Sequence, residues 1–216
     1  VDMRCSRVLG AEGLIRWNHP QQGLLVPTHF LSAISDTAAD IALGEWVIRT
    51  SLRQMQSWRA QGLDLAVSVN ISPYHLAQPD FVERLSRLLA EVPGTPRERL
   101  QIEVLENAAL EDIGHITTLM HDCIALGVSF ALDDFGTGYS SLTYLRRLPA
   151  QTLKIDQSFV RDMIKNTDDL AIIEGIIGLT RAFGLEVIAE GVETPELGVM
   201  LLQLGCDQGQ GYGISR

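Results

Sequence analysis

Residues 131–142 read Ala131-Leu132-Asp133-Asp134-Phe135-Gly136-Thr137-Gly138-Tyr139-Ser140-Ser141-Leu142. An apolar run from Val128 to Leu132 comes directly before the two aspartates, which is typical of a strand buried on both faces. Two carboxylates at such a strand end cannot both stay ionised and unpaired in a low-dielectric site, and one or two divalent metal ions would keep both charged. Gly136 and Gly138 allow the following loop to turn sharply and to approach a ligand closely. The alternative interpretation is a pair of helix-capping aspartates in a surface turn.

Polar side chains follow the other apolar segments of the chain in the same way. Segments 65–69, 100–102, 185–189 and 8–11 lead to Asn70, Glu103, Glu190 and Glu12, and Thr152-Leu153 leads to Lys154. Glu106 and Glu193 stand three residues after Glu103 and Glu190. Parallel α/β folds build their sites from polar groups at the carboxyl ends of successive strands. The pattern therefore favours a site at Asp133 and Asp134 over a surface turn.

Helical segments alternate with these strands. Helices are expected over residues 41–61, 81–92, 113–126, 168–183 and 195–204, each closed by a glycine or a Pro-Gly pair. The fourth helix should be capped by Thr167 or Asp168, and the fifth by Thr194 with Pro195 at its first position. Strands and helices that alternate with short connections predict right-handed βαβ units and a parallel sheet.

The number of strands indicates the fold class. Strand candidates lie around Val8, Leu65, Leu100, Val128, Thr152, Glu186 and 206–212. A (β/α)8 barrel has eight strands and typically runs ~250 residues, whereas this chain has 216. We therefore expect an α/β fold, a TIM-like barrel whose first strand lies upstream. Residues 1–216 would form a single domain, truncated at the N-terminus and just at the C-terminus.

Composition excludes several classes of partner. The formal net charge is −10, and an extended nucleic-acid surface would need a basic stripe, so no polymeric nucleic acid is expected. The three cysteines are far apart, so neither disulfides nor zinc are expected. The sequence has no apolar run of membrane-spanning length. We expect a cytoplasmic domain without membrane contact of its own, which leaves room for a membrane anchor in the parent protein.

The polar strand ends belong to motifs that occur in a fixed order. They read Glu12-Gly13-Leu14-Ile15-Arg16-Trp17, Asn70, Glu103-Val104-Leu105-Glu106, Asp133-Asp134-Phe135-Gly136-Thr137-Gly138, Leu153-Lys154-Ile155-Asp156, Ala189-Glu190-Gly191-Val192-Glu193 and Gln210-Gly211-Tyr212. In these residues the chain closely resembles the EAL-domain cyclic di-GMP phosphodiesterases, over nearly its whole length. The resemblance implies the EAL type of the barrel. The chain departs from the family at Gly13, usually alanine, and at Leu105, usually threonine. The family's upstream strand with a Gln-Pro pair is absent from this sequence, so one substrate contact is not assigned.

The resemblance implies two metal ions with oxygen ligands. Glu12, Asn70, Glu103 and Asp133 would hold one ion, and Asp133 would bridge to a second ion that Asp134 and Glu190 also hold. Carboxylate and amide oxygens suit Mg²⁺ or Mn²⁺, and the larger Ca²⁺ is expected to inhibit. Two such ions ~4 Å apart can activate a water for in-line displacement at a phosphate.

The resemblance also implies roles for residues around the metals. Lys154 would be the electrostatic partner of the water or the scissile phosphate, against the alternative of a solvated strand-end lysine. Glu190 is the candidate general base. Arg16 would bind a phosphate oxygen with two N–H groups, against the alternative of a surface ion pair. Leu14, Asp156 and Gln210 would complete the substrate-binding set. Glu106 would anchor the loop after Asp134, and Glu193 would give similar support from behind the ligands.

Three functions are compatible with these motifs. An active enzyme would linearise cyclic di-GMP to pGpG. An inactive receptor that binds cyclic di-GMP, or an interaction module built on the barrel, would not need all of the intact polar positions Glu12, Asn70, Glu103, Asp133, Asp134, Lys154 and Glu190. The resemblance therefore favours the enzyme, as a homodimer and fused to sensor or diguanylate-cyclase-like domains upstream.

Overall fold

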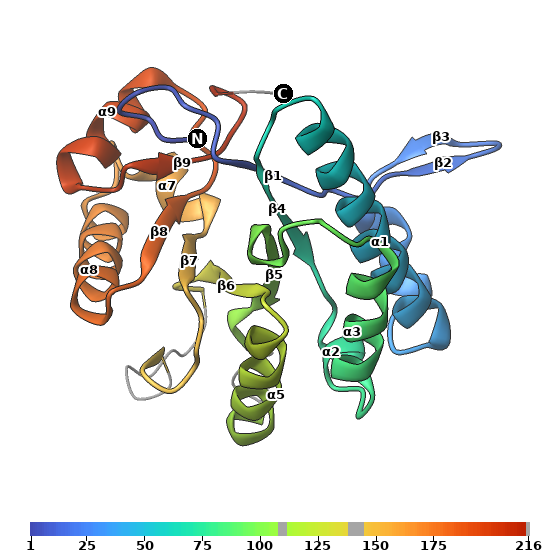
Figure 1. The fold of residues 1–216 in the computed structure, drawn as a ribbon. Coiled ribbons are helices and arrows are strands. Elements are labelled where there is room, and N and C mark those ends of the chain that lie inside the picture. The colour runs from blue at the N-terminus through green and yellow to red at the C-terminus, as the bar shows by residue number, and fades with distance from the viewer. Residues whose placement is uncertain (108–111, 138–144, 215–216) are drawn as a thin grey trace. The chain divides into compact units, whose positions relative to one another are not determined.

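The computed structural model describes residues 1–107, 112–137 and 145–214 (Figure 1). The chain divides into two compact units, which are described separately. Unit 1 holds Val1–Leu9, Val104–Met120 and the chain from Phe130 onward, and unit 2 holds Gly10–Glu103 and His121–Ser129. Residues 138–142, the end of the stretch quoted first, lie outside the described residues.

Unit 2 is built on parallel strands. β1 (Gly10–Glu12) pairs with β4 (Ala66–Asn70), which pairs with the first four residues of β5 (Leu100–Leu105). The register sets Glu12 opposite Ser68 and Asn70 opposite Glu103, so the polar strand ends fall at one edge of these strands.

Three helices accompany the strands of unit 2. They are α1 (Ala38–Ala60), α2 (Pro73–Leu76) and α3 (Phe81–Glu91), and α1 contacts β4, α2 and α3. Ile48, Leu52 and Met55 are the buried apolar residues of α1, and their spacing places them on one helical face. A short 3₁₀ turn, Arg97–Arg99, leads into β5.

Between β1 and α1 the chain forms a hairpin that the sequence analysis did not predict. β2 (Trp17–His19) pairs antiparallel with β3 (Gly23–Leu25), and 3₁₀ turns at Pro27–His29 and Leu31–Ala33 follow. The strand expected around Val8 begins instead at Gly10. A side chain at Gly10 would put a Cβ 2.7 Å from the Ala66 carbonyl oxygen, so this close pairing depends on glycine.

Unit 1 continues the pattern with parallel strands and helices. β6 (Ser129–Phe135), from Phe130 onward, pairs with β7 (Thr152–Ile155), then β8 (Glu186–Ala189) and β9 (Gln208–Gly209) follow in order. Its helices include α7 (Gln157–Asp162), α8 (Thr167–Phe183) and α9 (Pro195–Leu204). α8 contacts β7, β8 and α7, and it lies beside β8 in Figure 1. α5 (Ile113–Ala125) crosses the division between the units.

The last strand is shorter than the predicted 206–212. Pairing ends at Gly209, and Gly211 then passes so close to Val192 that a Cβ there would lie 2.4 Å from the Val192 nitrogen. At the same edge the N-terminal segment pairs beside β9, because the Gly209 N–H donates to the Val1 carbonyl oxygen at 3.0 Å.

The ends predicted for α9 are present, whereas α1 begins at Ala38 and not at Ile41, and the cap of α8 differs from the prediction. The Thr194 hydroxyl accepts a hydrogen bond from the Leu197 N–H, and Gly205 ends α9 in the left-handed conformation. For α8 the prediction of Thr167 or Asp168 as the cap was wrong. Asn166 is the cap, because its side-chain oxygen accepts from the Asp168 N–H at 3.0 Å. None of the described helices is long and apolar enough to cross a membrane.

The cap assignment predicts unequal effects of two neighbouring substitutions. Asn166→Ala removes the acceptor of the Asp168 N–H and should lower the free energy of unfolding by about 1 kcal/mol. Thr167→Ala, the control, changes only the first helical residue and should alter stability by less than about half that amount. Urea denaturation followed by circular dichroism measures both. Equal losses would contradict the assignment.

Candidate functional site

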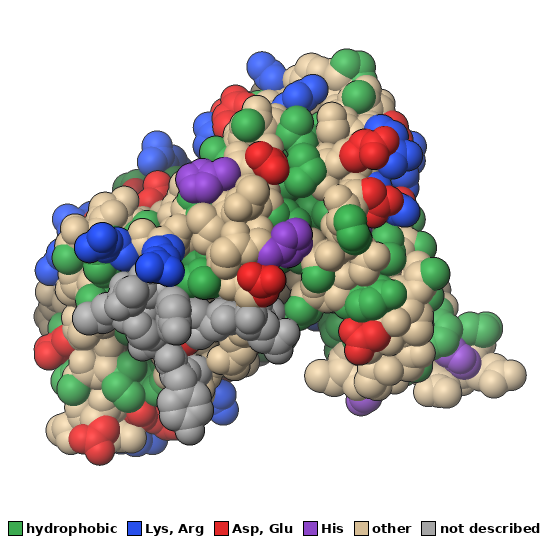
Figure 2. Space-filling view, turned by 90° about the horizontal axis from the view of Figure 1, so that it is seen from below, with side chains coloured by type: hydrophobic (Ala, Val, Ile, Leu, Met, Phe, Trp, Pro, Cys, Tyr) green, Lys and Arg blue, Asp and Glu red, His purple; other side chains and the backbone are tan. Residues whose placement is uncertain are grey.

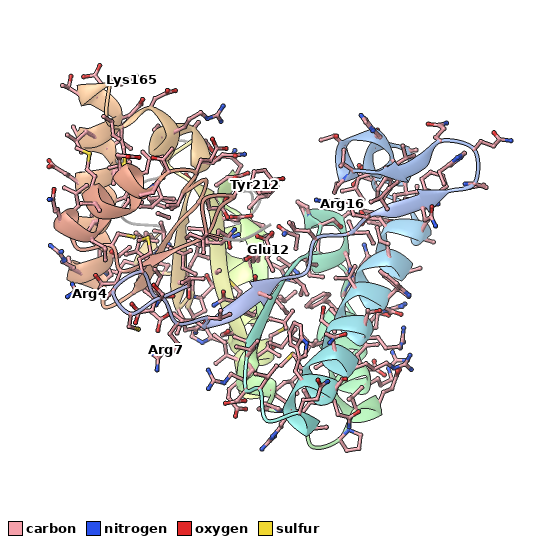
Figure 3. The ribbon with its side chains drawn as sticks, turned by 90° about the horizontal axis from the view of Figure 1, so that it is seen from above. Arg4, Arg7, Glu12, Arg16, Lys165 and Tyr212 are labelled. Atoms are coloured by element: carbon pink, nitrogen blue, oxygen red, sulfur yellow. The ribbon has the colours of Figure 1, made fainter. Side chains whose placement is uncertain are left out.

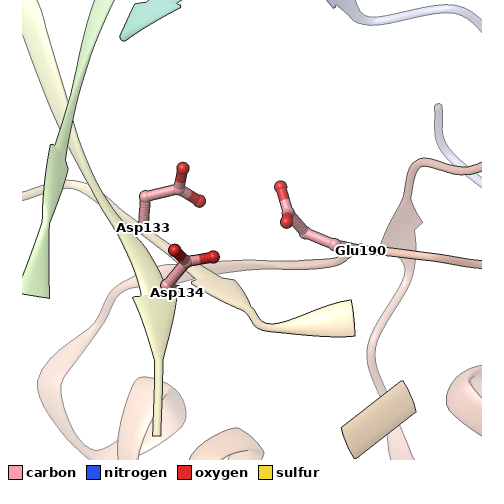
Figure 4. Close-up of side chains that lie close together, drawn as sticks. All are labelled: Asp133, Asp134 and Glu190. Atoms are coloured by element: carbon pink, nitrogen blue, oxygen red, sulfur yellow. The ribbon is translucent and has the colours of Figure 1, made fainter. Parts of the chain in front are cut away.

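The backbone at the end of β6 brings two adjacent carboxylates to one side. Neighbouring residues of a regular strand point to opposite faces. Here the pairing with β7 shifts register between Leu132 and Phe135, and Asp134 has a φ of 53°, in the left-handed region. Asp133 and Asp134 therefore both lie toward Glu190 (Figure 4). Such a conformation at a non-glycine residue costs of order 1 kcal/mol and is typical of functional sites.

Asp133, Asp134 and Glu190 form a cluster that could hold a metal ion. One carboxylate oxygen from each lies within 4.8 Å of the others. Burial, together with the charges of Asp133 and Asp156, raises the pKa of Asp134 to about 6. The crowding of negative charge and the purely oxygen donor set both fit a hard divalent cation such as Mg²⁺ or Mn²⁺.

Lys154 lies inside this cluster. Its side chain is 1% exposed, and its Nζ is 3.0 Å from Asp133 Oδ1 and 2.7 Å from Glu190 Oε1. The alternative interpretation of a solvated lysine at a strand end is therefore wrong. A buried ammonium needs charged partners, and here strands on either side of β7 supply them.

Glu190 also accepts a hydrogen bond from Gln210, and a tightly packed glycine follows it in the chain. Gln210 Nε2 donates to Glu190 Oε1 at 2.8 Å. Gly191, the next residue, has a φ of 68°, and a Cβ there would lie 2.7 Å from the Gln157 Cβ. The sequence analysis missed Gln157, although its place directly after the polar strand end Lys154-Ile155-Asp156 could have indicated it.

Asp156 lies at the end of β7 and caps α7. Its Oδ1 accepts from the Ser158 N–H at 2.9 Å and from the Ser158 hydroxyl. Burial would raise the pKa of Asp156, but these hydrogen bonds outweigh it and hold the pKa below its ordinary value. The residue is therefore a charged neighbour of Asp134.

The loop after Asp134 is tied to the segment after β5. Glu106 is 3% exposed, and its Oε2 accepts a hydrogen bond from the Gly136 N–H at 2.9 Å. Gly136 has a φ of 100°, and its position against Phe159 leaves room for no larger side chain without displacement. This is the contact that a loop-anchoring role for Glu106 requires.

In unit 2, polar side chains from three neighbouring strands form a separate set. Asn70 Nδ2 donates to Glu12 Oε1 at 2.8 Å and to Glu103 Oε2 at 3.0 Å. The amide thus joins two carboxylates from the neighbouring strands β1 and β5. The three side chains offer the same hard oxygen donors as the cluster in unit 1.

The remaining predicted residues are more exposed. Glu12 is the last residue of β1, and Arg16 directly precedes the hairpin (Figure 3). Arg16 donates to the Ile15 carbonyl oxygen at 2.8 Å, and Leu14 beside it is 56% exposed. Glu193 is also exposed, and its supporting role stays a prediction. On the face in Figure 2, the basic side chains of the described residues are scattered, several beside acidic ones.

Comparison with known proteins places these motifs in a family. The EAL domain model matches residues 1–216. The bifunctional diguanylate cyclase/cyclic di-GMP phosphodiesterase MucR of Pseudomonas aeruginosa is 39% identical over 210 residues, 97% of this chain and 30% of MucR. The cyclic di-GMP phosphodiesterase NbdA of the same species is 39% identical over 206 residues, 95% of this chain and 26% of NbdA. The chain thus spans less than a third of the length of these two relatives.

A solved structure supports the same placement. The MucR phosphodiesterase in its c-di-GMP complex matches with a TM-score of 0.93 at 38% identity, covering 97% of this chain and 85% of that chain. The likeness confirms the predicted fold class, a TIM-like α/β barrel of the EAL type.

The two glycines next to Glu12 and Glu190 should respond differently to alanine. At Gly191 the left-handed φ and the contact with Gln157 leave no room for a Cβ. Gly191→Ala should lower the free energy of unfolding by about 1–3 kcal/mol. At Gly13 the nearest atom to an added Cβ is the Ser68 carbonyl oxygen at 3.3 Å. Gly13→Ala, the matched control, should change stability by less than about 1 kcal/mol. Thermal unfolding measures both, and the reverse order would contradict this description.

Proposed function

Because the chain belongs to the EAL domain family, we propose that it is a metal-dependent phosphodiesterase that hydrolyses cyclic di-GMP to linear pGpG. The observation that carries the proposal is the buried Lys154, paired with Asp133 and Glu190 beside a third carboxylate. A binding module needs no buried cation among acidic groups. A phosphodiesterase uses such a group to stabilise charge that develops at a phosphate.

The acidic and amide side chains would hold the metal ions. We propose the ligand set that the resemblance implies: Glu12, Asn70, Glu103, Asp133, Asp134 and Glu190. Divalent Mg²⁺ or Mn²⁺ ions bound there would supply charge neutralisation at the phosphate and lower the pKa of an attacking water. The donor chemistry of both polar sets supports this assignment.

Lys154 and Gln210 would orient Glu190. Lys154 Nζ forms an ion pair with Glu190 Oε1 at 2.7 Å and Gln210 Nε2 donates a hydrogen bond to the same oxygen at 2.8 Å, so two contacts fix the carboxylate. A fixed carboxylate can accept a proton from a water that lies beside it, as a general base does. The Lys154 ammonium supplies a positive charge that needs no reorganisation during the reaction.

Substrate recognition would use the exposed residues. Cyclic di-GMP carries two phosphates, and the guanidinium of Arg16 can bind a phosphate oxygen pair with two parallel N–H groups. Leu14 lies close to Arg16 in sequence and offers apolar contact to a base or sugar. Asp156 is a further candidate for substrate contact.

The direct test is product formation. The chain is incubated with cyclic di-GMP and Mg²⁺, and chromatography identifies the product. Conversion to pGpG with Mg²⁺ or Mn²⁺, its loss in excess chelator and its inhibition by Ca²⁺ would support the proposal. Full activity in chelator would overturn the metal requirement, and binding of cyclic di-GMP without product would indicate a receptor.

Substitution of Lys154 should distinguish its effect on turnover from its effect on the stability of the fold. Lys154→Met removes the charge that pairs with Asp133 and Glu190, and turnover should fall by about 10²–10³-fold. Without metal the two carboxylates also lose their partner, so the protein should be less stable by about 3–5 kcal/mol. Added Mn²⁺ should restore stability but not turnover.

The control for this experiment is Lys165→Met, which alters the chain's other lysine, an exposed residue (Figure 3). It should leave turnover and stability unchanged. If Lys154→Met with bound metal turned over within a few-fold of the parent, Lys154 would have no part in the reaction.

We also propose a homodimer whose partner stabilises the ordered loop after Asp134. A partner that binds only the ordered loop shifts its population toward the form that holds metal. Glu106→Gln weakens the charge-assisted hydrogen bond to the Gly136 N–H and should lower Mn²⁺ affinity about tenfold or more. Calorimetry measures the affinity, with exposed Glu98→Gln as the control. A monomer as active and as metal-bound as the dimer would contradict the coupling.

A further inference from the structure

His75 is a buried titratable residue that the proposed reaction does not use. It lies in α2 of unit 2, five residues after Asn70, and is 1% exposed. Among the described residues neither Nδ1 nor Nε2 has a hydrogen-bond partner. A neutral imidazole always carries one N–H, and the protonated ring carries two. Proton uptake would therefore add a second unmet donor and a charge to this interior.

The ring packs against α1 on one side and against α3 on another. Gly44 of α1 lies directly against it: a Cβ at Gly44 would be 2.2 Å from His75 Nδ1 and 2.8 Å from Cε1. On the α3 side, the Phe81 ring meets His75 edge to face, with centroids 5.1 Å apart. The imidazole thus fills the position that a side chain on α1 would otherwise occupy.

Four charged side chains lie near this position, and three of them form ion pairs with one another. Arg84 pairs with Glu45 at 2.8 Å and with Asp80 at 2.6 Å, and Asp40 Oδ2 accepts from the Ser72 hydroxyl at 2.8 Å. Burial lowers the pKa of His75 from its ordinary value of 6.5. The nearby Glu45, Asp40 and Asp80 oppose that shift, and Arg84 adds to it.

We propose that His75 is a pH-sensitive latch, whose neutral ring seats α2 against α1 and α3 and whose protonation releases it. The sign follows from proton counts. Below pH 6.5 the unfolded chain binds a proton at His75 that the folded chain excludes, so stability is lost as pH falls toward the folded pKa. At neutral pH the latch is closed.

The latch acts next to a residue of the candidate site. Ile71 and Ser72 connect Asn70 to α2, and both are held: the Ile71 N–H donates to the Glu103 carbonyl oxygen, and Ser72 caps α2 while bonding Asp40. Release of α2 would loosen this connection and the placement of Asn70. The proposal concerns packing within unit 2 and does not depend on the reaction proposed above.

Replacement of His75 by glutamine removes the titratable group. Ser72 is the N-cap of α2, so His75 stands at the third helical position. The side-chain oxygen of a glutamine at that position can accept a hydrogen bond from the N-cap N–H, as in a capping box, and the amide does not titrate. His75→Gln therefore replaces the latch with a contact that is independent of pH. His121→Gln, at an exposed histidine of α5, is the matched control.

The test measures urea unfolding between pH 7.5 and pH 5, without substrate or metal. In the parent and in His121→Gln, the unfolding equilibrium constant should rise relative to His75→Gln by up to about tenfold per pH unit below the ordinary His pKa. A parent-to-His75→Gln ratio that stays constant over this range would overturn the proposal. Failure of hydrolysis would leave this measurement unaffected, so the two proposals fail separately.

A second pair of variants tests the packing even if His75→Gln does not fold. Gly44→Ala should lower the unfolding midpoint strongly, because its Cβ meets the imidazole. In Gly44→Ala/His75→Ala the ring is gone, and much of the loss caused by Gly44→Ala should disappear relative to His75→Ala. Losses that simply add would show that the ring does not lie against Gly44 and would overturn the latch.

Discussion

The pairing of Lys154 is the constraint on which unit 1 depends. One buried ammonium contacts Asp133 at the end of β6 and Glu190 just after β8, and so joins the strands on both sides of β7. A charge buried in this way is tolerated only with well-placed partners. The parallel register, with Lys154 opposite Ile188, places them. The geometry of the site therefore depends on the register of the sheet. A shift of β7 by one residue would turn the ammonium of Lys154 to the opposite face, away from its carboxylates.

The irregular backbone around the site follows from the same requirement. Asp134 adopts a left-handed φ so that two adjacent carboxylates face one point, and Gly136 and Gly191 adopt positive φ values on either side. These conformations are costly, and the buried core of the surrounding strands must maintain them. Burial raises the pKa of Asp134, and repulsion from Asp133 and Asp156 adds to that shift although Lys154 opposes it. A bound divalent ion would relieve that repulsion and stabilise the folded chain.

The sequence predicted the strand ends well because their chemistry is local. A polar residue after an apolar run needs no tertiary information, and Asn70 and Glu190 lie at strand ends as that pattern predicts, whereas Glu103 lies inside β5, two residues before its end. Prediction from the sequence failed where contacts between distant residues determine the local structure. The β2–β3 hairpin has too few residues for a periodic pattern. The choice of Asn166 over Thr167 as a cap depends on one side-chain hydrogen bond. The burial of Lys154 depends on partners far away in sequence.

Lys154 and His75 show two outcomes of burying a basic side chain. Lys154 keeps its charge because it forms ion pairs with two carboxylates. His75 is buried to the same 1% exposure, yet the acids around it are engaged by Arg84 and Ser72. Its ring can stay there only while neutral. The first arrangement fixes a positive charge among the carboxylates of the candidate site. The second makes the packing of α2 depend on pH, and α2 lies just after Asn70 in the chain.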